Sequence, residues 1–210
     1  MSTRSEIRRA ALRAGLILAT FAIVGSAILA SANWATRERI ADNERLVMVR
    51  QLQEILPAGS YDNALLEDTL ALNLPKSITP SNPVTAYLAR RNDYPVAVIL
   101  PVTAPNGYSG AIELLVGVQR DGRIAAVRVV KHRETPGLGD GIDTSRGDWI
   151  HQFEGTSLNK PEVWAVRKDG GNFDQLTGAT ITPRAIVRAV HGALEYVHAH
   201  HKEIFGDGDV

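Results

Sequence analysis

The chain has 210 residues, 44% hydrophobic and 22% charged, which is the composition of an ordinary globular protein. Twenty-three Lys and Arg balance 23 Asp and Glu, so there is no basic excess to indicate nucleic-acid binding. The absence of Cys excludes disulfides, Cys-ligated metal centres and a Cys nucleophile.

The first predicted element is an apolar helix near the N-terminus. Residues 14–32 contain no charged side chain. As a helix of ~28 Å they match the ~30 Å hydrocarbon core of a bilayer. Four Arg precede the segment and Trp34 follows it at the position of an interfacial aromatic residue. Since positive charge favours the cytoplasmic side, the N-terminus is expected in the cytoplasm.

Three interpretations of this segment remain open on the residues alone. It is a membrane anchor, with residues 1–13 in the cytoplasm and a transmembrane helix over 14–33, or a cleavable signal peptide, or a buried core helix. Ala30-Ser31-Ala32 has the form of a signal-peptide cleavage site. The apolar run exceeds the ~7–15 residues of a signal peptide's apolar region, which favours the anchor.

A connecting helix is predicted over 34–56, because apolar residues recur there at helical spacing and Pro57 ends the pattern. Residues 57–210 then form one domain. The segment 57–92, punctuated by Pro and Asn, predicts no clear element.

An antiparallel sheet and a closing helix follow. Short runs rich in apolar residues predict strands over 95–102, 110–118 and 123–132, with a short further strand over 163–168. Asp121-Gly122 predicts a hairpin. A helix is predicted over 182–202, with Thr182 as its N-cap and Pro183 at its first position. The fold class is therefore α+β, with a mainly antiparallel sheet and flanking helices.

A glycine-rich loop covers residues 133–148, which include four Gly and one Pro. It lacks the pattern of a nucleotide-binding loop, since no G-x-x-x-x-G-K-[ST] occurs. It is either a plain surface loop or a loop in which the backbone approaches a flat ligand closely.

The segment 174–180 places two hydroxyl residues around Gly-Ala immediately before the closing helix. One interpretation is a turn that leads into the helix. The other is an anion site, because N–H groups and the positive end of the helix dipole stabilise a phosphate. A hydroxyl at that position could be esterified to the phosphate.

Thr177-Gly178-Ala179-Thr180 resembles the [ST]-G-A-[ST] flavinylation motif of the FMN-binding domain family. The resemblance extends over most of the chain and is strongest from 95 to 190, within a domain core of about 95–200. It implies that FMN is joined through its phosphate to Thr180 by a flavin transferase that uses FAD.

The resemblance also implies which residues surround the cofactor. Besides Thr180 these are Asp174, Thr177, Gly178, Ala179, Tyr108, Ser109, Glu134, Thr135, Gly137, Leu138 and Gly139. No catalytic residue and no metal ligand is expected, because the flavin ring carries the redox chemistry.

With its N-terminal helix, the chain closely resembles the family of G subunits of Rnf/Rsx electron transport complexes. That family implies an uncleaved, single-pass inner-membrane protein whose domain lies in the periplasm. Its partners would be the lipid bilayer and the other membrane subunits. Its complex transfers electrons between ferredoxin and NAD, coupled to ion translocation, or keeps a redox regulator reduced. Two alternatives stay open: the C subunit of a sodium-pumping NADH:quinone oxidoreductase, and a binding module without flavin.

Overall fold

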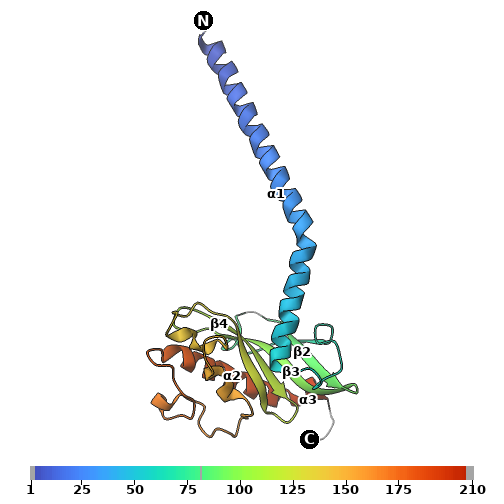
Figure 1. The fold of residues 1–210 in the computed structure, drawn as a ribbon, viewed down its shortest axis with the longest axis vertical. Coiled ribbons are helices and arrows are strands. Elements are labelled where there is room, and N and C mark those ends of the chain that lie inside the picture. The colour runs from blue at the N-terminus through green and yellow to red at the C-terminus, as the bar shows by residue number, and fades with distance from the viewer. Residues whose placement is uncertain (1–2, 81, 207–210) are drawn as a thin grey trace. The chain divides into compact units, whose positions relative to one another are not determined.

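The computed structural model describes residues 3–80 and 82–206. The chain forms two compact units, Met1–Met48 and Val49–Val210. Helix α1 (Thr3–Ile55) runs without a break through the predicted spanning segment and the predicted connecting helix, and ends two residues before Pro57 (Figure 1). Its stretch Leu12–Arg37 is long and apolar enough to cross a membrane, and lies outside the buried core.

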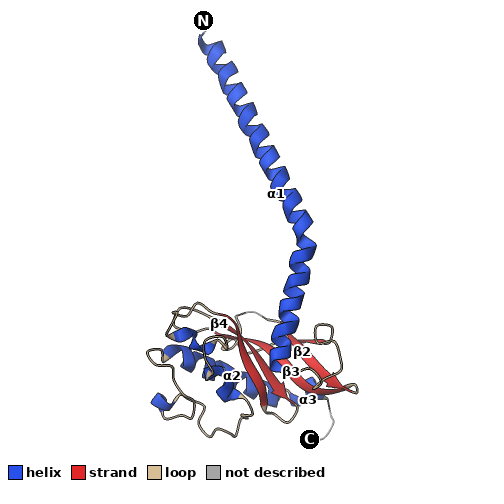
Figure 2. Ribbon diagram, in the orientation of Figure 1, coloured by secondary structure: helices blue, strands red, loops and turns tan. Residues whose placement is uncertain are grey.

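The second unit is built on a five-stranded antiparallel sheet in which each strand pairs with the next along the chain. The strands, shown in red in Figure 2, are β1 (Thr69–Leu72), β2 (Val84–Arg91), β3 (Tyr94–Ala104), β4 (Ile112–Gln119) and β5 (Ile124–Lys131). The three strands predicted before residue 133 correspond to β3, β4 and β5. The predicted hairpin joins β4 to β5, with Gly122 at φ +81°. Strands β1 and β2 lie where the sequence pattern predicts none.

Both faces of β4 are covered, which explains its nearly continuous apolar sequence. Leu114 and Val116 belong to the main core, where helix α2 (Ile181–Ala199) packs on β3 and β4. Because side chains alternate along a strand, Gly117 faces the other way. There it meets the last turn of α1, since a Cβ on Gly117 would lie 2.2 Å from Ile55 Cγ2.

The strand predicted over 163–168 is wrong. Val166 makes only an isolated bridge with Phe173, and a short 3-10 helix, η3 (Arg167–Asp169), follows. Gly170, at φ +83°, turns the chain back so that the Arg167 N–H donates to the Phe173 carbonyl at 2.7 Å. The segment therefore pairs with its own continuation and adds no strand to the sheet.

The prediction for the start of the closing helix is also wrong. Thr180 is the N-cap residue of α2, and the helix begins at Ile181. Pro183 is therefore at its third position. Thr182, the predicted cap, is fully buried and points its hydroxyl at Glu134. Helix α2 ends at Ala199. His200 separates it from a second short helix, α3 (His201–Phe205).

Candidate functional site

The segment 174–180 contains a tight turn immediately before α2. Leu176 and Ala179 face each other across it, and the Ala179 N–H donates to the Leu176 carbonyl at 3.1 Å. Gly178 has a φ of +78°, the left-handed conformation required at the third position of a type II turn. Thr177 and Gly178 are exposed, so the turn is accessible to a ligand.

Thr180 follows this turn and starts helix α2. Its backbone already has helical angles, φ −92° and ψ −27°. Its carbonyl accepts a helical hydrogen bond from the Arg184 N–H at 3.3 Å. Its half-buried side chain makes no capping hydrogen bond. The hydroxyl thus lies at the positive end of α2, where N–H groups without an intrahelical partner favour an anion.

Asp174 fixes the other end of the turn. Its carbonyl accepts a hydrogen bond from Trp149 Nε1 at 2.6 Å, and its N–H donates to Gln152 Oε1 at 2.7 Å. Both partners come from the short 3-10 helix η2 (Trp149–Phe153). The carboxylate of Asp174 pairs with Arg167 Nη1 at 2.9 Å on the surface. The backbone of Asp174 is therefore anchored while its side chain stays exposed.

Part of the glycine loop lies against the turn. The Leu138 and Gly139 N–H groups both donate to the Thr135 carbonyl at 3.1 Å, and Gly137 between them and Thr135 has φ +76°. This loop turn presents the Leu138 side chain, which is 46% exposed. A Cβ on Gly178 would lie 2.9 Å from Leu138 Cδ2, so the two predicted site segments are in contact.

Glu134 is buried beneath the loop. Its Oε1 accepts the Ser109 N–H at 3.0 Å, and its Oε2 accepts the Thr182 hydroxyl. Ser109 lies between β3 and β4, and its neighbour Tyr108 is 67% exposed. One carboxylate therefore joins the 107–110 loop, the glycine loop and the first turn of α2.

An ion pair lies on the surface beside this first turn. The Arg184 guanidinium donates from Nε and Nη2 to the two oxygens of Asp169, at the end of η3. These hydrogen bonds lower the pKa of Asp169 and raise that of Arg184. Arg184 is consequently occupied by a protein carboxylate.

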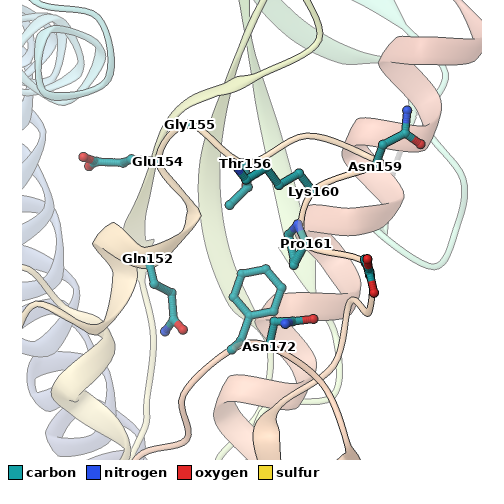
Figure 3. A pocket seen from close by; sticks show the side chains of 10 residues that line it. Gln152, Glu154, Gly155, Thr156, Asn159, Lys160, Pro161 and Asn172 are labelled. Atoms are coloured by element: carbon teal, nitrogen blue, oxygen red, sulfur yellow. The ribbon is translucent and has the colours of Figure 1, made fainter.

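A cavity of about 800 Å³ lies beside η2 and extends from Gln152 to Asn159 and Lys160 (Figure 3). Most of the residues that line it are polar, and Phe173 is an apolar exception. Gln152 also binds Asp174, so this cavity adjoins the anchored end of the turn.

The structure brings together Leu138 with Gly178, and Ser109 with Glu134. Sequence reasoning missed Thr182, Trp149 and Gln152 as residues that support the site. Thr182 belongs to a Thr-Pro pair that is typical of a helix start. Its hydrogen-bond partner, Glu134, lies 48 residues away in the chain. No local pattern could have indicated that contact.

Comparisons with known proteins match two families. The FMN-binding domain model matches residues 107–195, and the RnfG N-terminal region model matches residues 1–55. The G subunit of the ion-translocating oxidoreductase complex of Pseudomonas aeruginosa is 50% identical over 94% of this chain and 93% of its own length. That of Pseudoalteromonas atlantica is 44% identical over 91% and 90%. The crystal structure of Shewanella oneidensis NqrC covers 64% of this chain and 71% of its own at 22% identity, with a TM-score of 0.48.

Proposed function

The chain belongs to the family of G subunits of ion-translocating oxidoreductase complexes and has its FMN-binding domain, and we propose that its FMN is covalently attached to Thr180. The observation that carries this proposal is the position of the Thr180 hydroxyl. It follows an exposed turn, makes no capping bond and lies at the N-terminus of a 19-residue helix.

The attachment is a phosphoryl transfer to this hydroxyl. The Thr180 oxygen bonds to the FMN-side phosphorus of FAD, AMP leaves, and the hydroxyl proton passes to the flavin transferase. The resulting diester carries one negative charge, which the N-terminus of α2 stabilises by about 0.3–1 kcal/mol. Exposure of Thr177 and Gly178 gives the transferase access to the turn.

When bound, FMN takes up and releases electrons singly or in pairs, which suits a carrier between redox centres. The protein's part is to hold and orient it. We propose that two exposed side chains contact the flavin ring: Leu138, which lies against the turn at Gly178, and the aromatic Tyr108, which precedes Ser109. Residues 14–32 carry no ionisable group, so this segment offers no charged side chain to an ion pathway.

We propose that α1 anchors the chain in the inner membrane with the domain in the periplasm. The Arg residues before the apolar stretch support this orientation. A covalent bond has a clear use there, because a flavin that dissociated outside the cytoplasm would not be replaced. The bond also permits the flavin to remain exposed for electron exchange with a partner.

The decisive experiment is fluorescence of the denatured protein. The full chain is produced in membranes together with the flavin transferase, separated on a denaturing gel and viewed under ultraviolet light. We expect a fluorescent wild-type band, a fluorescent Thr180→Ser band, and a dark Thr180→Val band from protein that remains folded and membrane-bound. Flavin released from the wild type on denaturation, or retained covalently by Thr180→Val, would contradict the proposal.

A further inference from the structure

We infer that Glu134 is a positioning residue for flavin attachment: it acts through Thr182 to fix the first turn of α2 and thereby the Thr180 hydroxyl. The inference rests on the proposed function, because it concerns the acceptor of that same reaction. It assigns to Glu134 a task inside the protein, in place of direct contact with the cofactor.

Burial is the first support. Among the described residues, the buried polar side chains are Thr79, Glu134 and Thr182. Glu134 is 5% exposed and Thr182 is 0% exposed, and the two are hydrogen-bonded to each other. A buried carboxylate is costly unless its oxygens are satisfied. Here one oxygen accepts the Thr182 hydroxyl and the other accepts the Ser109 N–H at 3.0 Å.

Two glycines make room for this carboxylate. A Cβ on Gly139 would lie 2.9 Å from Glu134 Oε2 and 3.1 Å from Thr182 Oγ1. A Cβ on Gly107 would lie 2.9 Å from Glu134 Oε1. Any side chain at either position would crowd the carboxylate. The two loops are therefore shaped around Glu134 and its hydrogen bonds.

The consequence concerns Thr180, two residues before Thr182. The segment 174–182, which contains the turn and Thr180, is fixed at both ends, by Trp149 and Gln152 at Asp174 and by Glu134 at Thr182. The residues between these anchors include the exposed turn. Because reactions between bound groups are sensitive to misplacement by about 1 Å, anchoring the first turn of α2 matters for transfer to the Thr180 oxygen.

Charge argues for action through Thr182. A carboxylate that faced the FMN phosphate would repel it, whereas both oxygens of Glu134 are engaged by protein donors. A carboxylate has only acceptors and so matches two donors, and its hydrogen bonds are about twice as strong as neutral ones. Glutamine at this position would keep the shape and lose that charge assistance.

The test measures attachment in vitro. Full-length protein is purified in detergent from cells without the transferase, then incubated with purified transferase and FAD, and the rate of covalent fluorescence is followed at several acceptor concentrations. The variants are Thr182→Val, Thr182→Ser and Glu134→Gln, with Thr85→Val and Glu113→Gln as exposed controls on strands β2 and β4.

We expect kcat to fall about 100-fold in Thr182→Val, with KM nearly unchanged, because the acceptor is misplaced while the docking surface persists. Thr182→Ser should restore the rate, Glu134→Gln should be intermediate, and both controls should match the wild type. Thermal unfolding followed by circular dichroism verifies that each variant is folded. Because serine keeps the hydroxyl, rescue by Thr182→Ser would show that the lower rate in Thr182→Val comes from the lost hydrogen bond and not from a general loss of packing.

Two outcomes would overturn the inference in different ways. If the wild type is labelled and Thr182→Val and Glu134→Gln are labelled equally fast, the positioning role is wrong and the proposed function stands. If the wild type itself is never labelled, the proposed function fails and the positioning role fails with it.

Discussion

At the residue scale, two separate features of the structure require glycine at position 178. Its φ is +78°, and a Cβ there would lie 2.9 Å from Leu138 Cδ2. Strain of a non-glycine residue in this backbone region costs about 1–3 kcal/mol. We therefore expect Gly178→Ala to lower the free energy of unfolding by at least that amount, measured by urea denaturation, and to slow flavin attachment.

Gly122 offers a matched control, because its φ is +81° and a Cβ there meets nothing within 4 Å. Gly122→Ala should therefore show the backbone cost alone. The additional loss in Gly178→Ala should disappear when Leu138→Ala is combined with it. Equal losses in both single variants would mean that Leu138 moves aside freely, and that the contact between loop and turn is loose.

The ion pair of Arg184 and Asp169 predicts a pH dependence. Hydrogen bonds from Arg184 lower the pKa of Asp169 below 3.8, its value in an unfolded chain. The pair therefore contributes its full stability above pH 3.8, and the contribution is lost as the pH falls through the lower pKa of the folded state. At neutral pH Asp169→Asn should unfold more easily than the wild type, and this difference should vanish in acid.

Unfolding midpoints of the wild type and Asp169→Asn, measured from neutral to strongly acidic pH, check this sign. Glu162→Gln removes an exposed carboxylate from a neighbouring loop and serves as the control. A difference between the wild type and Asp169→Asn that stayed constant with pH would show that the carboxylate charge is not what stabilises the pair.

The packing of α1 on β4 is the contact to test at the scale of elements. Gly117→Ala should lower the free energy of unfolding by about 1–3 kcal/mol, because its Cβ collides with Ile55. Ile55→Ala should cost about 2–5 kcal/mol through the cavity that it leaves. Because the new methyl group enters that cavity, the double variant should be less destabilised than the sum of the two. Strict additivity in urea denaturation would mean that the two residues do not meet.

The same scale shows what could be predicted from the sequence. Strands β3 to β5 have local signals, namely short runs of apolar residues and the Asp121-Gly122 turn, and all three were predictable. The short strand β1 was not, because it is stabilised by pairing with β2 along a register that no local pattern encodes. The segment 163–168 has residues typical of a strand. It forms none because the chain turns back at Gly170 and pairs with its own continuation.

The candidate site divides in the same way. The turn before α2 and the glycine loop could be predicted, since motif and composition are local. Their support could not, because Trp149 binds Asp174 across 25 residues and Glu134 binds Thr182 across 48. Such contacts depend on the completed fold.

At the scale of the whole molecule, the two parts of α1 differ in what they contribute to the buried core of the domain. The stretch Leu12–Arg37 contributes nothing to the buried core, whereas Leu52, Ile55 and Leu56, at the end of α1 and just after it, are each at most 4% exposed. A membrane-spanning element thus continues in sequence into residues that the domain needs for its own stability. We can therefore predict at which residues of α1 a shortened chain can begin and still fold.

A chain that starts at residue 34 should be soluble, unfold at the same urea concentration as the full chain in detergent, and accept flavin from the transferase, because its core is intact. A chain that starts at residue 57 lacks three buried apolar side chains, each worth about 2–5 kcal/mol. Since domains have a net stability of about 5–15 kcal/mol, this second chain should be largely unfolded. Urea denaturation and fractionation of membranes compare the three chains. Equal stability of the two shortened chains would show that the end of α1 is only a linker. If the chain that starts at residue 34 stayed in the membrane fraction, the anchor would lie elsewhere.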